Sequence, residues 1–286
     1  DLVSSSLPTP VGAPLASVVS EPWSETVLRG AQLFNDAFDV RLAQDSYIAC
    51  AHCHLEGASD RLTWDFTGRG EGLRNTIDLR GRAGLGHGPL HWSANFDEPQ
   101  DFEHDIRGPF SGLGLMDDRD FMAEERDRPL GAPKAGLSPD LDALAAYMTA
   151  LDTYPRSPWR MDDGALTDAA RRGAILFEEL ACATCHAGPT MTDSALVDGT
   201  PILHDVGTLT EASGSRLGGA LMGIDTPTLR ALWDNGPYFH DGSAPSLEAV
   251  LTDAAPGSVH DLREQLSADE RAELIAWLLS LDGSPL

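Results

Sequence analysis

Residues 50–54 read Cys-Ala-His-Cys-His, and residues 182–186 read Cys-Ala-Thr-Cys-His. These two stretches contain all four cysteines of the 286-residue chain. Both follow the pattern C-x-x-C-H, which is typical of covalent c-type haem attachment. Two thiols three positions apart on one turn can each add to a haem vinyl group, and the next imidazole then lies under the iron. The sequence therefore predicts two covalent c-type haems, held by Cys50, Cys53, His54, Cys182, Cys185 and His186.

A zinc ribbon and a pair of local disulfides are the other common uses of such cysteines. Neither requires a histidine directly after the second cysteine of both motifs. Zinc ribbons also usually bring their cysteine pairs closer in sequence than these, which lie in opposite halves of the chain.

Covalent haem attachment also predicts a compartment, because the attachment machinery works outside the bacterial cytoplasm. We therefore expect a periplasmic or secreted protein from which an export signal has been cleaved. The sequence starts at Asp1, without an initiator Met.

A short repeat precedes each haem motif. The frame R-G-A-x-L-F occurs at residues 29–34 and again at residues 172–177. Each copy lies in a helical pattern with a suitable N-cap, Ser24 in the first half and Thr167 in the second. The two halves differ here mainly by an eleven-residue insertion between the repeat and the first motif.

A second helix is predicted near the end of each half. Apolar residues three and four apart give a core face to a helix that opens at residues 137–139. They do the same for one that opens at residues 266–270, where Ser267 and Glu270 form a capping box. Tyr147 and Trp277 occupy matching positions in these helices.

This arrangement resembles the helical frame of a cytochrome c, in which a glycine lets the entering helix cross the later one close to an aromatic residue. The predicted fold class is mainly α. It has two cytochrome c-like domains with long irregular loops, each wrapped around one c-type haem. The boundary is expected in residues 152–158, which include two prolines, so the domains are residues 1–157 and 158–286.

The charge balance limits the partners. Twenty Lys and Arg stand against 45 Asp and Glu, a formal net charge of −25. This is the wrong sign for neutralising phosphates, so it argues against nucleic acid and favours a basic docking partner. No apolar run approaches the roughly 20 residues of a membrane helix, so no membrane span is expected.

Three segments after the second haem motif resemble those of a particular family of haem proteins. Residues 225–230 read D-T-P-T-L-R, residues 236–242 read G-P-Y-F-H-D-G, and residues 246–250 read S-L-E-A-V. In content and order they resemble the T-P-[TS]-L-R, P-Y-F-H-D-G and L-E-x-A-V series of the di-haem bacterial cytochrome c peroxidases and MauG. In the first half, residues 73–76 resemble the family's R-N-x-P-T element without its proline.

The resemblance weakens around the expected reaction centre. The family's acid-base glutamate aligns with Leu115, and its pocket glutamine aligns with Asp105. A carboxylate for proton transfer is then expected from Asp105, with Glu103 as the second choice. A charged pair before Arg107 is also typical of a solvated face or a structural ion pair.

The first haem is expected to be open on its far side. No histidine lies between His54 and Arg74, where many of the peroxidases carry a removable distal ligand. Its absence favours a permanently open, MauG-like site.

The second haem needs a second axial ligand. The peroxidases place a Met, and MauG a Tyr, shortly after L-E-x-A-V. Here the next residue of a ligating type is His260. We therefore predict His260 as the ligand, with Met222 as runner-up and other side chains or an open iron as the remaining alternatives. The resemblance assigns loop or propionate contacts to His240 and, similarly, His204. Lone histidines are more often surface or core residues than ligands, which applies to His87, His91 and His104.

The resemblance implies two further features. Trp92 lies near the family's tryptophan, which implies an electron relay between the haems; the alternative is a core aromatic. The resemblance also implies a calcium ion at the domain junction, bound by the side-chain oxygen of Asn75 and the carbonyls of Thr226 and Thr228. Such oxygen ligands suit a hard cation.

Three functions remain open at this stage. The first is a di-haem oxidoreductase that reacts with hydrogen peroxide at the first haem and exchanges electrons through the second with a redox partner protein or a protein substrate. The second is a di-haem electron-transfer cytochrome without peroxidase activity, which the missing glutamate favours. The third is a haem sensor or interaction module. The axial state of the first haem distinguishes them.

Overall fold

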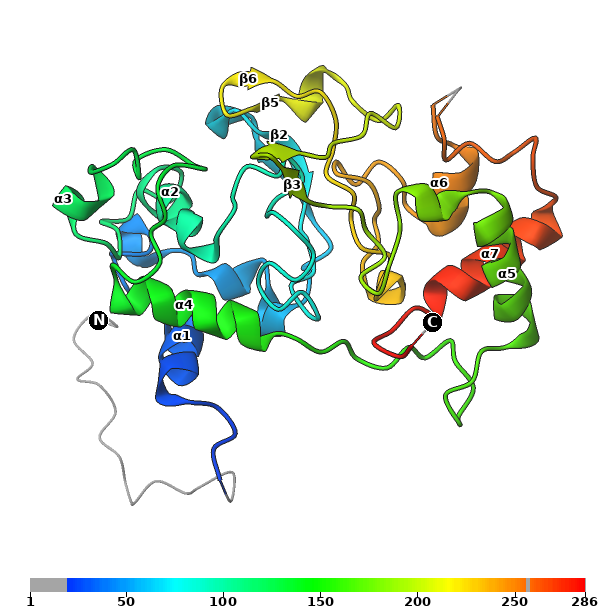
Figure 1. Ribbon diagram of the computed structural model, residues 1–286, viewed down its shortest axis with the longest axis horizontal. Helices are drawn as coiled ribbons and strands as arrows, with labels where there is room; N and C mark the ends of the chain where they lie inside the picture. The colour runs from blue at the N-terminus through cyan, green and yellow to red at the C-terminus, as the bar shows by residue number, and fades with distance from the viewer. Residues whose placement is uncertain (1–19, 256–257, 286) are drawn as a thin grey trace, which may run out of the picture.

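Two helix pairs frame the molecule, one in each half of the chain (Figure 1). The computed structural model describes residues 20–255 and 258–285. In the first half α1 (Glu25–Asn35) packs against α4 (Pro139–Ala150). In the second half α5 (Asp168–Glu179) packs against α7 (Ala268–Leu279). These are the four helices that the sequence predicts, and the fold is helix-rich, as expected.

The predicted helix caps are confirmed. Ser24 accepts a hydrogen bond from the Val27 amide at 3.3 Å. Thr167 accepts one from the Ala170 amide at 3.1 Å. At the start of α7, Ser267 and Glu270 form the reciprocal capping box. These side chains satisfy backbone donors that have no partner within the first turn of a helix.

The remaining elements are short and separated by irregular chain. Three helices are α2 (Phe102–Arg107), α3 (Asp118–Phe121) and α6 (Leu247–Thr252). The strands form three antiparallel pairs: β1 (Thr63–Phe66) with β2 (Gly72–Asn75), β3 (Leu196–Val197) with β4 (Thr200–Pro201), and β5 (Ser215–Arg216) with β6 (Gly219–Ala220). Single 3₁₀ turns occur at Gln44–Ser46, Cys50–His52, Leu55–Gly57, Thr67–Arg69, Pro99–Asp101, Cys182–Thr184, Glu211–Ser213 and Leu232–Asp234.

Each helix pair crosses at the glycine of its repeat. A Cβ atom on Gly30 would lie 1.9 Å from the carbonyl oxygen of Ala143, and one on Gly173 would lie 2.0 Å from that of Glu273. Beside each crossing an aromatic pair packs. The ring centroids of Phe34 and Tyr147 are 5.0 Å apart, and those of Phe177 and Trp277 are 4.3 Å apart. The repeat in the sequence is thus a repeat in the structure.

Gly30→Ala should lower the free energy of unfolding by about 2 kcal/mol, because the new methyl group meets backbone atoms that cannot rotate away. Gly219→Ala is the matched control, since its Cβ would meet its nearest atom, the carbonyl oxygen of Arg216, at an ordinary contact distance of 3.5 Å. Urea unfolding followed by circular dichroism measures both. Equal stability of the two variants would contradict the close crossing.

The apolar core is divided in the same way. One cluster of buried side chains gathers around α1 and α4 and includes Leu33, Ile106 and Leu144. The other gathers around α5 and α7 and includes Met191 and Leu274. Between them run residues 152–158, the predicted linker.

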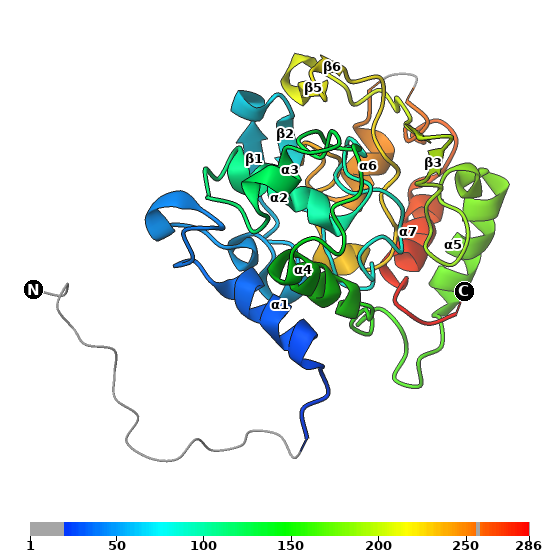
Figure 2. The ribbon, with the colours of Figure 1, turned by 60° about the vertical axis from the view of Figure 1, so that its left-hand side comes forward.

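Loops of the second half reach across to the first half. The Arg74 side chain donates to the carbonyl of Ser213 at 2.9 Å. The backbone amide of Asn75 donates to the carbonyl of His240 at 2.6 Å. The Arg216 side chain donates to the carbonyl of Ser93 at 2.7 Å. Figures 1 and 2 show the segment with β5 and β6 lying beside β2. The two halves of the chain therefore share an extensive interface, which the expected division into two domains did not include.

Within the described ranges, every helix is too short or too polar to cross a membrane.

Candidate haem sites

The first haem motif forms one turn at the edge of a cavity. Cys50–His52 is a 3₁₀ turn, and the amide of His54 donates to the carbonyl of Cys50 at 2.9 Å. Cys50, Cys53 and His54 all line a cavity of about 620 Å³. His52 instead turns back on the chain and accepts from the Ala49 amide at 2.9 Å. The turn therefore presents two sulfurs and one imidazole to the same space.

The cavity suits a haem group. Its walls are rich in apolar side chains, among them Phe34, Leu42, Phe66, Ile77, Leu90, Ile106, Phe110 and Leu144. Burial lowers the pKa of His54 to about 4, so its imidazole is neutral and able to bind a metal. Its Nδ1 atom is buried without a hydrogen-bond partner among the described residues.

Three arginines, Arg69, Arg74 and Arg82, also line this cavity, and the sequence interpretation gave none of them a role there. Arg82 is buried in its wall. Arg69 stacks on the rings of Phe66 and Phe110, at 4.5 and 4.6 Å. Cations facing an apolar cavity fit a ligand that carries carboxylates, as haem does in its propionates.

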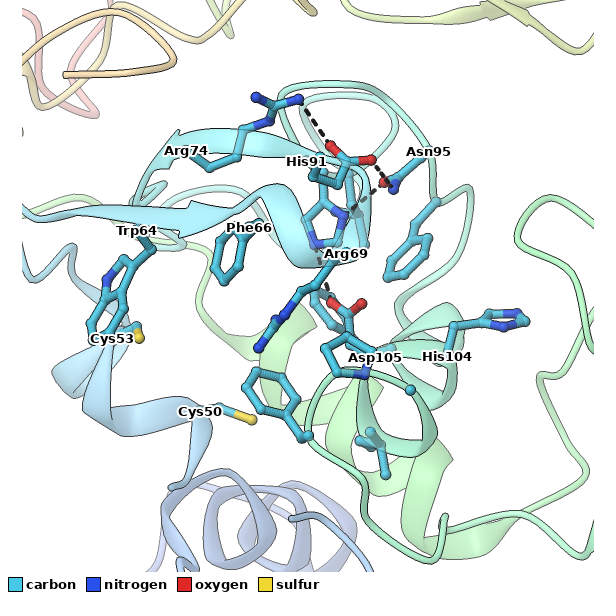
Figure 3. Close-up of a pocket in the computed structure, with 18 of the residues that line it drawn as sticks. Cys50, Cys53, Trp64, Phe66, Arg69, Arg74, His91, Asn95, His104 and Asp105 are labelled. Atoms are coloured by element: carbon cyan, nitrogen blue, oxygen red, sulfur yellow. Dashed lines mark hydrogen bonds and ion pairs between the residues drawn. The ribbon is translucent and has the colours of Figure 1, made fainter. Parts of the chain in front are cut away.

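A chain of polar side chains enters the same cavity (Figure 3). Asp105 projects from α2, and one of its carboxylate oxygens lies 3.8 Å from Nε2 of His91. His91 Nδ1 is 2.7 Å from the side-chain oxygen of Asn95, whose amide nitrogen donates to Glu71 at 3.0 Å. Glu71 is paired with Arg74 at 3.1 Å. Burial raises the pKa of the Asp105 carboxyl, while His91 and Arg69 oppose the shift.

Glu103 lies outside this cavity lining. Its side chain is fully buried and accepts from the backbone amides of Leu115 and Met116 at 2.9 and 3.0 Å. It also accepts from Nε of Arg107 at 2.6 Å. The two amide bonds hold the loop at residues 115–116 onto α2, and the Arg107 bond lies within the helix. Of the two predicted carboxylates, the structure places only Asp105 in the cavity, and Glu103 forms the structural ion pair that was the alternative.

The second haem motif repeats the turn of the first. Cys182–Thr184 is a 3₁₀ turn, and the amide of His186 donates to the carbonyl of Cys182 at 3.0 Å. The imidazole centroids of His186 and His260 are 6.5 Å apart. Two imidazoles on opposite sides of one metal, each at about 2 Å, have centroids about 6 Å apart. The separation therefore suits a shared iron.

Both rings are in a suitable state for metal binding. Burial lowers the pKa of His186 to about 4 and also lowers that of His260. Nδ1 of His260 is buried without a hydrogen-bond partner in the described part of the chain.

The competing candidates for this iron are placed less well. Met222 is 75% exposed. His204 is paired with Asp193 at 2.8 Å, and His240 lies 2.8 Å from the hydroxyl of Ser213.

Trp92 links the first cavity to the second half of the chain. It lines the cavity, and its indole nitrogen donates to the carbonyl of Asn75 at 2.7 Å. Its own carbonyl accepts from the amide of Asp225 at 2.8 Å. This position is compatible with a relay, and the same contacts would also serve a structural role.

The predicted calcium ligands lie on the segments that Trp92 joins. The side-chain oxygen of Asn75 is buried without a hydrogen-bond partner among the described residues, so it is available to a cation. The carbonyl of Thr226 accepts from the Thr192 hydroxyl at 2.6 Å. A carbonyl oxygen has two lone pairs, so this bond leaves room for a metal.

Comparison with known proteins places the chain among di-haem proteins. It is 31% identical to hydrazine synthase subunit gamma of Kuenenia stuttgartiensis, over 90% of this chain and 78% of that protein. It is 28% identical to the methylamine utilization protein MauG of Methylorubrum extorquens, over 98% and 82%. It is 26% identical to cytochrome c peroxidase Ccp of Escherichia coli, over 91% and 58%.

No protein-family model matches the chain. Among solved structures, Kuenenia stuttgartiensis hydrazine synthase aligns with a TM-score of 0.56 and 26% identity over 97% of both chains. A MauG-like protein associated with microbial copper homeostasis aligns with a TM-score of 0.60 and 19% identity, over 96% of this chain and 94% of that one. Together with the motifs in both halves, these similarities show that the chain belongs to the family of di-haem cytochrome c peroxidases and MauG.

Proposed function

We propose that the protein is a di-haem oxidoreductase that reacts with hydrogen peroxide at a haem attached to Cys50 and Cys53. It exchanges electrons through a second haem attached to Cys182 and Cys185. When bound, the two haems supply the iron centres and the electrons that reductive cleavage of the O–O bond requires.

The difference between the two sites carries this proposal. At the second motif, His186 faces the imidazole of His260, and the two rings would hold an iron between them. At the first motif, His54 faces a cavity that contains a carboxylate. A saturated centre suits electron transfer, whereas a centre with space and a proton donor suits reaction with a small substrate.

The protein's own residues have separate tasks at the first site. His54 would bind the haem iron, and the two cysteines would fix the orientation of the cofactor. The apolar walls exclude bulk water, which strengthens electrostatic interactions inside the cavity. Asp105 accepts a proton from one peroxide oxygen and delivers it to the other, which leaves as water. Such a positioned acid-base group contributes about 10²- to 10⁴-fold to a rate.

Two measurements test the proposal. Electron paramagnetic resonance of the resting ferric protein should show one high-spin and one low-spin haem, and stopped-flow mixing with hydrogen peroxide should change the spectra of both. Two low-spin haems that stay inert to excess peroxide, even after one-electron reduction, would leave an electron-transfer cytochrome. Leu115, an apolar residue where the family has its glutamate, is the observation that favours this second candidate.

His260→Gly should convert the low-spin signal of the second haem to high-spin, because His186 would then face an empty coordination position. Met222→Ala is the matched comparison, and its exposed side chain predicts an unchanged spectrum. A spectral change in Met222→Ala but not in His260→Gly would reverse the assignment.

The same proposal includes a calcium ion held by Asn75 and the carbonyls of Thr226 and Thr228. Its place between segments of the two halves would fix the distance between the haems, on which electron tunnelling depends steeply. Metal analysis and haem spectra before and after exhaustive chelation test it.

Trp92 is proposed as the electron relay between the two haems. An undiminished rate of second-haem oxidation in Trp92→Phe would show that the side chain serves only in core packing.

The partners and compartment follow from charge and chemistry. With a net charge of −25, the surface favours a basic redox protein or protein substrate. Covalent haem attachment favours the periplasm or the exterior, after removal of an export signal. Salt dependence of the reaction with a candidate partner tests the electrostatic part, because screening weakens a charge-steered encounter.

A further inference from the structure

We infer that His91 and Asp105 act as one proton-holding pair, in which His91 stores and returns the proton that Asp105 exchanges in the cavity. Asn95 and Glu71 hold His91 in the required tautomer. This inference rests on the proposed function and names the residues that regulate proton movement at the same site.

The two side chains come from different elements and meet at the cavity (Figure 3). His91 follows β2 in a loop, and Asp105 lies on α2; their nearest ionisable atoms are 3.8 Å apart. The separation is longer than a direct hydrogen bond, but an oxygen atom of a small substrate or water can contact both groups. Such contacts often tighten only when substrate is bound.

The His91 ring is held firmly in this position. Phe96 and Phe102 pack against it with centroids at 4.5 and 5.2 Å. Its backbone has a φ angle of +68°, in the left-handed region that non-glycine residues rarely adopt. The two aromatic contacts hold the ring where it faces Asp105.

The hydrogen-bond network determines which ring nitrogen of His91 carries the proton. The amide nitrogen of Asn95 donates to the Glu71 carboxylate at 3.0 Å, so the amide oxygen must face His91. That oxygen lies 2.7 Å from Nδ1, which must therefore be the protonated nitrogen. Nε2 is left with a free lone pair directed toward Asp105. Glu71 is itself fixed by Ser93 at 2.9 Å and Arg74 at 3.1 Å.

The pair can hold one proton in two ways, as a neutral acid beside a neutral imidazole or as a carboxylate beside an imidazolium. The charged groups around Asp105 are His91, Arg69 and Glu71. Burial favours the first arrangement, and Arg69 favours the second. Both arrangements carry the same total charge, so movement of the proton between the two groups leaves the net charge of the cavity unchanged. The pair moves this proton only, and the electrons come from the bound haems.

His87 provides the matched comparison. It lies in the same loop as His91 but outside the lining of this cavity. Its Nε2 atom is 2.8 Å from the hydroxyl of Tyr154. His87 therefore has a polar partner away from the cavity, whereas His91 faces Asp105 within it.

The test compares His91→Gln with His87→Gln in the haem-loaded protein. His91→Gln should keep the resting spin state, slow the reaction with peroxide about 10- to 100-fold, and shift the pH profile of the rate. His87→Gln should match the wild type in all three. In Asp105→Asn, the additional change His91→Gln should have little effect, because groups that act as a unit are not additive.

Cyanide binding to the ferric protein gives a readout that does not require peroxide activity. Hydrogen cyanide must lose its proton on binding, and the pair is positioned to receive it. His91→Gln should therefore weaken cyanide affinity and change its pH dependence. If His91→Gln does not fold, Asn95→Ala is the alternative variant, because it leaves His91 in place but no longer fixes which ring nitrogen carries the proton. It should shift the pH profile in the same direction.

Two results would overturn the inference. The first is a His91→Gln protein with wild-type peroxide kinetics and cyanide binding, which would reduce His91 to packing. The second is a first haem that is low-spin at rest in the wild type and high-spin in His91→Gln, which would make His91 an iron ligand. A wild-type protein inert to peroxide but with cyanide binding sensitive to His91→Gln would refute the proposed function and leave the pair standing.

Discussion

Asp105→Asn should slow the reaction of the protein with hydrogen peroxide by about 10²- to 10⁴-fold and leave the resting spectra of both haems unchanged. The amide has nearly the same shape as the carboxyl but cannot exchange a proton at neutral pH. Asp105 lines the cavity beside His54, and the other lining carboxylate in the described structure, Glu71, is already bound by Arg74 and Asn95. The loss should therefore appear in the chemical step and not in cofactor attachment.

The rate of the peroxide reaction should change with pH as Asp105 gains or loses its proton. Burial raises the pKa of Asp105, so the protonated form persists to higher pH than in an exposed aspartate. The base needed for the first proton transfer is then lost as the pH falls through this raised pKa. Wild-type rates should decrease on that limb, and Asp105→Asn should lack the limb altogether. Stopped-flow measurements across the pH range show both.

Asp65→Asn is the matched control, because Asp65 lies exposed on β1 and outside the cavity lining. Its rate should equal that of the wild type. Wild-type kinetics in Asp105→Asn would mean that the proton is transferred by another group.

The helix frame was predictable because its determinants are local. Caps such as Ser24 and Thr167 satisfy amides within their own first turn, and apolar spacing along ten residues defines a buried face. The glycine of the repeat, aligned twice with an aromatic residue of the later helix, then predicts the crossing. The haem motifs are local in the same sense, since one turn contains both cysteines and the histidine.

The choice between Glu103 and Asp105 was not predictable in this way. Residues two apart on a helix point about 200° away from each other, so only one of them can face the cavity. Which one does so depends on the loop at residues 115–116, whose amides bind Glu103. That loop returns to α2 only in the folded protein.

The contribution of the second half to the first cavity was also beyond the sequence. Leu217 and Gly218 line that cavity although they follow the second haem motif. Arg80 and Arg61 of the first half both pair with Asp234, the former at 2.8 Å. A linker with two prolines indicates a boundary between cores, but it does not show how far loops cross it. The two haem sites are therefore parts of one interface-rich structure.

Glu103→Ala should have the largest effect on stability, lowering the free energy of unfolding by about 3–5 kcal/mol. The substitution removes the acceptor of two backbone amides and of the Arg107 guanidinium from a fully buried position. The buried amides of Leu115 and Met116 would be left without a partner, and Arg107 would keep only its bonds to Asp118 and the Met116 carbonyl. Urea unfolding followed by circular dichroism measures the loss.

Glu124→Ala separates this effect from the loss of any ion pair. Glu124 also pairs with an arginine, Arg126, at 2.7 Å, but its side chain is 72% exposed, and such pairs contribute about 0–1 kcal/mol. A Glu103→Ala protein that is as stable as Glu124→Ala would show that the loop at residues 115–116 is held by other contacts. Because Glu103 lies outside the cavity lining, the folded fraction of Glu103→Ala should still react with peroxide, whereas Asp105→Asn should be stable and slow. Opposite outcomes for two carboxylates two residues apart would assign one to the fold and the other to the chemistry.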